Sequence, residues 1–159
     1  MTDDKLFCWA KSEGSKAIKE LKIDIDLPDA TIKYYPNFIS YDDSLLWLDN
    51  LYQQCAWRQD RIVMFGKLID IPRLQAWYGD RNADYCYSKL KLTALAWTPL
   101  LADIKQRVEV FCEQQFNSVL VNCYRDHQDS MGWYSDDEPE LGNKPIIASL
   151  SLGAKRVFQ

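Results

Sequence analysis

Hydrophobic residues in this chain form two stripes at helical spacing, and after the second stripe, which ends at residue 112, they form short strand-like runs. Each of two helical stripes follows a helix-start signal. Ser40 with Asp43 three residues later precedes the first stripe, and Thr98-Pro99, a cap followed by proline, precedes the second. The pattern predicts an amphipathic helix over residues 43–55 and a second helix that begins at Thr98-Pro99. The stripes consist of Leu45, Leu48, Leu51, Tyr52 and Cys55, and of Leu101, Ile104, Val108, Phe111 and Cys112.

Short apolar runs bounded by turn residues predict the strands. Helices followed by closely spaced strands indicate an α+β domain, in which the helices buttress a sheet or a double sheet. Residues 1–30 are predicted to be an irregular leader, and residues 31–159 a single domain of this class. The predicted strands are Ile32–Tyr35, Arg61–Phe65 before Gly66, Ser118–Tyr124, Ile146–Leu152 before Gly153, and one that begins at Lys155–Phe158, with a polar loop at Asp126–Gly132.

The last predicted strand begins at the final residues of the sequence. Its pairing partners would lie beyond Gln159, so we expect the C-terminal part of the domain to be missing. An apolar sheet edge that is left open invites aggregation.

The composition excludes several classes of protein. A chain of 159 residues with 47% hydrophobic residues has enough apolar material for one compact domain. It has no apolar stretch near the ~20 residues that span a bilayer, and its acidic N-terminus lacks the pattern of a secretion signal. Five cysteines without a CxxC pair disfavour a disulfide framework or a zinc knuckle and favour thiols buried as small hydrophobes. We therefore expect a monomer in the cytoplasm, or in the nucleus of a eukaryote.

Charge is unevenly placed, although the net charge is only −4. Residues 61–91 carry six basic side chains against three acids, whereas residues 126–140 carry six acids and no lysine or arginine. A basic segment followed by an acidic one suits a protein that grips phosphates with one part and holds a cation with the other. A solvated surface with uneven charge explains the same pattern.

The segment from Asn122 onward is the richest in chemically active side chains. Positions two apart on a strand share a face, so Asn122 and Tyr124 are expected to point together and to offer an amide and a phenol. Tyr134 and Asp136 would also share a side if the strand continues through them.

Several segments, in this order, resemble the core of AlkB-type iron(II)/2-oxoglutarate dioxygenases, the family that removes alkyl damage from nucleic acid bases. The resemblance runs from about Ile32 to the last residue. It implies a double-stranded β-helix, or jelly-roll, which is incomplete here and has the N-terminal helices as its buttress. The segments are Met64–Lys67, Ile71–Gly79, Asn122–Asp126, Asp136–Gly142 and Pro145–Ala154.

The resemblance implies that Fe(II) is held by a His-x-Asp pair and a later histidine, a set that leaves iron positions open for the cosubstrate and oxygen. Asp136 stands at the carboxylate position, but Tyr134 stands where the first histidine is expected. A phenol with a pKa near ~10 is a poor Fe(II) ligand, and the second histidine would lie beyond Gln159. His127, the only histidine, is expected to be an exposed loop residue. Weak iron binding is therefore expected of this sequence.

The resemblance also assigns the cosubstrate and the nucleic acid contacts. It implies that Asn122 and Tyr124 bind 2-oxoglutarate, while arginines expected beyond the last residue hold its far carboxylate. A hairpin tip probes the duplex where a base has been flipped out, two tyrosines sandwich that base, two acids contact its edge, and an arginine meets the backbone. Taken singly, the tip phenylalanine would pack in the core, the tyrosines in a sheet, and the lysine in a turn. The residues concerned are Phe65, Gly66 and Lys67 at the tip, Tyr85 and Tyr87, Asp137 and Glu138, and Arg73.

The sequence thus predicts a DNA repair dioxygenase by descent, which dealkylates bases in DNA or RNA and is inactive in this form. One alternative is a non-catalytic nucleic-acid-binding protein that keeps the base-flipping surface without iron. Another is a defective gene fragment with no stable fold.

Overall fold

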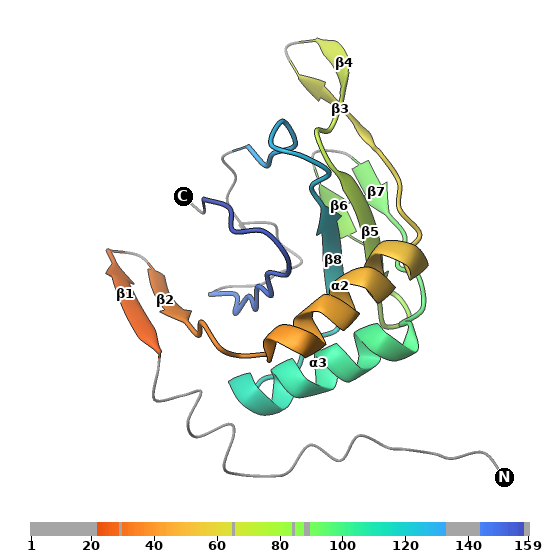
Figure 1. The fold of residues 1–159 in the computed structure, drawn as a ribbon. Coiled ribbons are helices and arrows are strands. Elements are labelled where there is room, and N and C mark those ends of the chain that lie inside the picture. Colours follow the sequence, from red (N-terminus) through yellow and green to blue (C-terminus); the bar gives the residue numbers. More distant parts are fainter. Residues whose placement is uncertain are drawn as a thin grey trace, which may run out of the picture. The chain divides into compact units, whose positions relative to one another are not determined.

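The structure, a computed structural model, describes residues 22–28, 30–64, 66–83, 85–87, 90–132 and 144–157. It divides into two compact units, Met1–Leu45 and Leu46–Gln159, which are described separately below. Figure 1 shows the elements along the chain. Neither helix in the described part of the chain has the length and hydrophobicity needed to cross a membrane.

The first unit contains an antiparallel hairpin of β1, Ile23–Leu27, and β2, Ala30–Tyr34. The strand predicted at Ile32–Tyr35 is therefore confirmed with a shift of its bounds. β1 lies inside the segment predicted to be irregular, so residues 23–27 belong to a strand and not to a leader without structure. The signal for β1 is the alternation of isoleucine with aspartate, because a period of two places the apolar residues on one face.

The helix α2, Tyr41–Gln54, confirms the first helix predicted from the apolar spacing. Ser40 begins it as expected, because its Oγ accepts a hydrogen bond from the backbone N of Asp43 at 3.1 Å. Trp47 is the buried residue of this helix, whereas the leucines of the predicted stripe at 45 and 48 are exposed. The predicted stripe is therefore packed at Leu51 and Cys55 but not at its first two leucines.

The helix α3, Pro99–Cys112, begins where Thr98 and Pro99 predicted. Thr98 accepts from the backbone N of Leu101 at 3.2 Å, and Glu113 ends the helix in the left-handed conformation. The buried positions of the predicted stripe include Leu101, Ile104 and Phe111. Cys112 was expected in this stripe and is exposed, because it lies at the last helical position.

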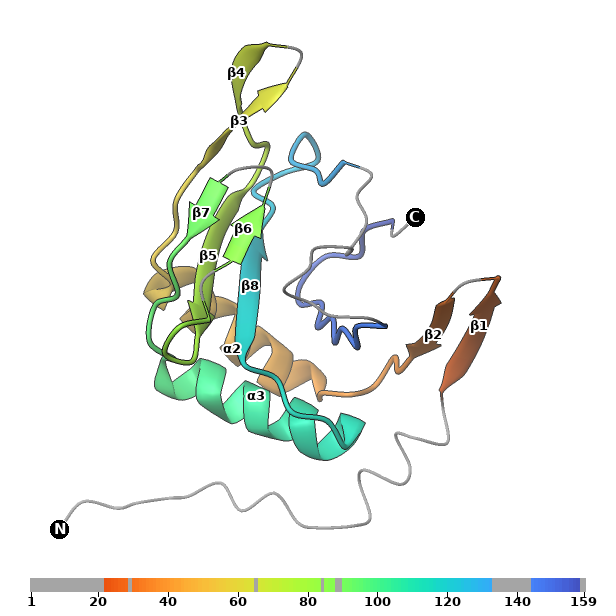
Figure 2. The same cartoon turned by 180° about the vertical axis from the view of Figure 1, so that it is seen from behind.

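The core forms around an antiparallel pair of strands, β5, Leu74–Gly79, and β8, Ser118–Cys123. Ala76 and Tyr78 of β5 are buried in one cluster with Leu101 of α3 and Cys55, which follows α2. Figure 2 shows α2 and α3 lying next to each other beside this sheet. Both helices therefore cover the same face of β5 and β8. The partly buried residues of the cluster are Leu51, Trp57, Trp97, Val119 and Val121.

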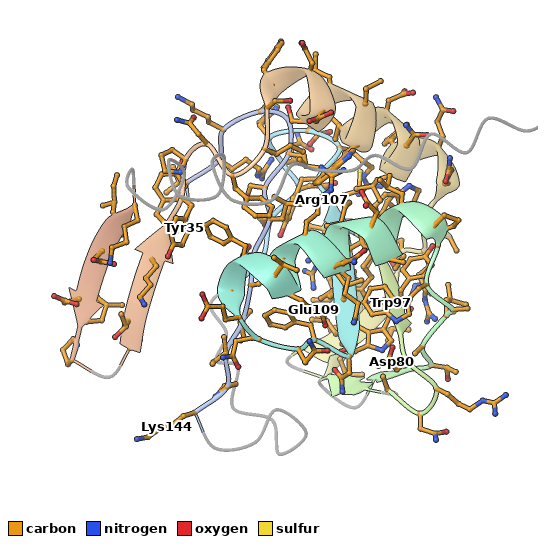
Figure 3. The ribbon with its side chains drawn as sticks, turned by 90° about the horizontal axis from the view of Figure 1, so that it is seen from below. Tyr35, Asp80, Trp97, Arg107, Glu109 and Lys144 are labelled. Atoms are coloured by element: carbon orange, nitrogen blue, oxygen red, sulfur yellow. The ribbon has the colours of Figure 1, made fainter. Side chains whose placement is uncertain are left out.

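Side-chain hydrogen bonds tie this core to its neighbours. The Tyr78 hydroxyl accepts from the backbone N of Ala56 at 2.8 Å. The indole Nε1 of Trp97 donates to Asp80 Oδ1 at 2.8 Å, and Figure 3 shows these two side chains close together at the edge of the molecule. Burial raises the pKa of the Cys55 thiol, which stays protonated. Cys55 thus packs as a small hydrophobe, as predicted for the cysteines of this sequence.

Two further hairpins complete the described strands. β3, Arg61–Met64, pairs with β4, Lys67–Asp70, and β6, Tyr85–Tyr87, pairs with β7, Leu90–Leu92. The predicted strand at 61–65 is confirmed as far as Met64. Helices with antiparallel strand pairs agree with the α+β class, whereas a complete double-stranded β-helix is not formed by the residues that the structure describes.

The strands predicted at Ile146–Leu152 and from Lys155 are wrong for the described residues 144–157, which contain no strand. A strand needs a neighbour whose N–H and C=O groups complete its ladder. Within the described residues this segment has no such neighbour, and Ile146 is 59% exposed. The apolar character of the segment is therefore insufficient to make it a strand.

Candidate cosubstrate and nucleic acid site

The face of β5 and β8 that is turned away from the helices carries polar side chains. Gln75 and Asn122 are register partners across the two strands, on the face opposite to Ala76 and Val121. Arg73, just before β5, reaches the same place, because its Nε donates to Asn122 Oδ1 at 3.0 Å. We call Arg73, Gln75, Asn122 and Tyr124 the site face.

Arg73 is buried, with 4% of its surface exposed. Its predicted contact with a nucleic acid backbone stays a prediction. Arg73 is buried because it directly precedes β5, where its guanidinium donates to the side chains of Asn122 and Gln75. The sequence interpretation assigned Arg73 by order in the chain and had no information on which way it points.

A buried carboxylate lies behind the site face. Asp60 is 7% exposed and accepts from Gln75 Nε2 at 2.8 Å through one oxygen and from Arg58 Nε at 2.8 Å through the other. Sequence reasoning did not identify Asp60 or Gln75. The available signal was the glutamine at a position of β5 that faces away from the helices, but only the fold brings residue 60 to it.

Tyr124 follows β8 and is held by a second arginine. The guanidinium of Arg156 lies 4.6 Å from the centre of the Tyr124 ring, a cation–π contact. Arg156 also donates to the backbone oxygen of Asp126 at 3.1 Å and to that of Asp129. Residues 144–157 therefore contact the site face through Arg156.

The loop after β8 is closed by an ion pair. Arg125 Nε lies 2.8 Å from Asp129 Oδ2, and the backbone N of Arg125 donates to the same carboxylate at 2.9 Å. These hydrogen bonds lower the pKa of Asp129 from 3.8 to about 2. His127 lies in this loop and is exposed, as predicted.

The β3–β4 hairpin projects from its unit, as Figure 1 shows. Gly66 turns it with a φ of +75°, a value that side chains rarely adopt, and Lys67 is exposed beside it. Val63 is 72% exposed, so apolar as well as basic side chains stand in solvent near the tip. Phe65 lies outside the described residues, and its predicted role remains a prediction.

The structure describes the other predicted site residues only in part. Tyr85 and Tyr87 are two apart on β6, a spacing that places them on one face, but their side chains lie outside the described part. The predicted metal and base-edge residues Tyr134, Asp136, Asp137 and Glu138 lie outside the described residues.

Comparison with known proteins decides the family. The family model described as the 2OG-Fe(II) oxygenase superfamily matches residues 31–159. The chain belongs to this superfamily. Fe(II) and 2-oxoglutarate are the metal and cosubstrate in the superfamily's own description.

Curated relatives identify the branch of the superfamily. The chain is 41% identical over 126 residues to the alpha-ketoglutarate-dependent dioxygenase alkB homolog 3 of Homo sapiens, an alignment that covers 79% of this chain and 43% of that protein. It is 45% identical over 98 residues to the DNA oxidative demethylase ALKBH2 of Bos taurus, covering 62% of this chain and 35% of that protein. The 2OG-Fe(II) oxygenase described here is therefore of the AlkB type and spans less than half the length of these relatives.

The site face fits the cosubstrate of the superfamily. 2-Oxoglutarate is a dianion rich in oxygen, so it needs N–H and O–H donors and positive charge. Asn122 offers amide N–H groups and Tyr124 a hydroxyl, and the buried guanidinium of Arg73 places positive charge beside them. For Fe(II), the described residues contain no group of three or more side chains from His, Cys, Asp and Glu that could hold a metal.

Proposed function

We propose that this chain is part of an AlkB-type dioxygenase that oxidatively removes alkyl groups from bases in nucleic acids, with 2-oxoglutarate as cosubstrate and Fe(II) as metal. The observation that carries the proposal is the site face, in which Asn122 of β8 lies beside a buried arginine and Tyr124 follows directly after the strand. The superfamily match gives this arrangement its chemical meaning. Of the expected metal ligands, we assign the carboxylate to Asp136.

Nucleic acid is the proposed partner. The relatives include proteins named as a DNA oxidative demethylase. The β3–β4 hairpin supports the same partner, because Lys67 is exposed next to the turn at Gly66 and could meet a phosphate. We assign Phe65 to the space left by a flipped base, Tyr85 and Tyr87 to stacking on that base, and Asp137 and Glu138 to its edge.

A second candidate function is nucleic acid binding without catalysis. The observation in its favour is Tyr134, which stands two residues before Asp136 where the resemblance expects histidine. Histidine nitrogen binds Fe(II) well, whereas a protonated phenol does not. A protein with this substitution could keep the hairpin and the site face and still bind modified bases.

Cosubstrate binding tests the first proposal. Calorimetric titration of the chain with 2-oxoglutarate, with and without Mn²⁺ in place of Fe(II), should show one saturable site. Asn122→Ala and Tyr124→Phe should weaken it by about tenfold each, because each removes a hydrogen bond to a charged group. Binding that neither substitution changes would contradict the site face as the cosubstrate site.

Formaldehyde release separates the two functions. Oligonucleotides with 1-methyladenine or 3-methylcytosine are incubated with the chain, Fe(II) and 2-oxoglutarate, and unmethylated oligonucleotides serve as the control. Formaldehyde from the methylated strands alone supports the dioxygenase. Preferential binding of the methylated strands without formaldehyde supports the non-catalytic protein. If the chain neither releases formaldehyde nor prefers the methylated strands, both functions are refuted.

A further inference from the structure

The oxygen of the Asn122 amide has a defined partner. Arg73 Nε donates to Asn122 Oδ1 at 3.0 Å. A guanidinium is a donor in all of its polar groups and has no acceptor, so it can meet the oxygen of an amide but not its NH₂ group. The contact therefore decides which end of the Asn122 amide faces Arg73.

Arg73 is itself held by groups with defined polarity. Asp60, a carboxylate, accepts from Gln75 Nε2 at 2.8 Å, and this turns Gln75 Oε1 toward Arg73, whose Nη2 donates to it at 3.5 Å. These contacts form a chain in which Asp60 only accepts and Arg73 only donates. The Gln75 amide links these two residues, and Asn122 stands at the end beside Arg73. Each member fixes the orientation of the next, and the first three members are almost fully buried.

We propose that Arg73 is a positioning residue, which fixes the Asn122 amide with its nitrogen free to donate to the carboxylate of 2-oxoglutarate. The inference rests on the proposed function, which makes Asn122 a cosubstrate ligand. A flipped amide would place its oxygen against the anion and its NH₂ against a guanidinium, and both contacts would be repulsive. Arg73 prevents this flip without touching the cosubstrate.

A double-mutant cycle tests the route of the effect. The affinity for 2-oxoglutarate is measured by calorimetry for the unmodified chain, Arg73→Met, Asn122→Ala and the double variant. Arg73→Met should weaken binding about tenfold, because the amide is no longer oriented. In the Asn122→Ala background the same change should have no further effect, because the group that Arg73 orients is gone.

Additive losses in the cycle would overturn the inference, because Arg73 would then act on the cosubstrate directly or through the fold. Arg81→Met, which removes an exposed arginine outside the site face, is the matched control and should leave the affinity unchanged. Arg73→Lys keeps the charge and one donor and should recover part of the affinity. If Arg73→Met fails to fold, the cycle is run with Arg73→Lys and the same criterion of additivity.

A second measurement does not depend on the cosubstrate. The side-chain amide of Asn122 gives a pair of signals in a two-dimensional ¹⁵N–¹H spectrum, identified by their loss in Asn122→Asp. In the free chain Arg73→Met should shift this pair and speed its exchange with solvent, whereas Arg81→Met should not. An unchanged pair would overturn the inference. Absence of 2-oxoglutarate binding by the unmodified chain, with the expected amide shift present, would instead refute the proposed function and leave the orienting contact established.

Discussion

β8, Ser118–Cys123, and the segment Ile146–Leu152 are both short apolar runs, and the same reasoning predicted a strand for each. β8 pairs with β5 along its whole length, and Val119 and Val121 pack against the core cluster that the helices cover. The later segment has no ladder within the described residues, and Ile146 and Ile147 are exposed. An apolar run thus becomes a strand when a partner completes its hydrogen bonds and another element covers its apolar face.

The contrast extends to what the two regions do for the site. β8 presents Asn122 to a buried arginine and ends at Cys123, directly before Tyr124. Residues 144–157 reach the site face through Arg156, which lies over the Tyr124 ring. One region is held by core packing, and the other by a few polar contacts.

The largest effect is expected from a charge placed in the core under β5. Ala76 is 1% exposed between Tyr78 and Leu101, so Ala76→Asp would bury a carboxylate without a partner. The loss should exceed about 3 kcal/mol, a large part of a total stability of about 5–15 kcal/mol. The control, Ile147→Asp, alters an exposed residue and should change stability by less than about 0.5 kcal/mol. Urea unfolding followed by circular dichroism measures both, and equal losses would contradict the contrast.

A smaller loss is expected when the carboxylate behind the site face is removed. Asp60→Ala leaves Gln75 and Arg58 without their acceptor and should cost about 1–3 kcal/mol. The matched control is Asp70→Ala, because Asp70 pairs with Arg61 on the exposed hairpin with 55% of its side chain in solvent. That change should cost less than about 1 kcal/mol. The ranking of the two midpoints in urea checks the prediction.

Arg156→Ala should act locally. It removes the contact with the Tyr124 ring and the hydrogen bonds to the loop after β8, together worth about 1 kcal/mol. Amide hydrogen exchange should become faster in residues 124–130 and stay unchanged in β5. Faster exchange throughout β5 would show that the two regions form one cooperative unit.

The smallest effect is expected from pH. Asp129 has a folded pKa of about 2 against 3.8 for the ordinary carboxyl, because Arg125 donates to it. A depressed pKa stabilises the folded loop above about pH 4, and this contribution is lost as the pH falls toward about 2. As the pH falls through that window, the protection of the Arg125 amide against hydrogen exchange should decrease in the unmodified chain. In Asp129→Asn, this protection should not change over the same window. A flat profile in the unmodified chain would mean that the ion pair does not hold the loop.

Local signals were sufficient where the cause of the structure is local. Ser40 and Thr98 begin α2 and α3 because a hydroxyl next to the first turn meets N–H groups that have no other partner in the helix. Gly66 turns the β3–β4 hairpin because it adopts a positive φ at little cost. The order of the motifs also identified the family, because the order of motifs is a property of the sequence alone.

Tertiary structure decided the features that depend on what lies next to a residue. Periodicity identified α2 and the packed positions Leu51 and Cys55, but it did not identify Trp47, which is buried although it lies outside the predicted stripe. The sequence assigned Arg73 a contact with a nucleic acid backbone but did not predict its burial against Asn122, and it did not identify Asp60 at all. Burial and pairing are properties of residues brought together from distant parts of the chain, so composition and spacing determine which segments are able to form helices and strands, and packing determines which of them do.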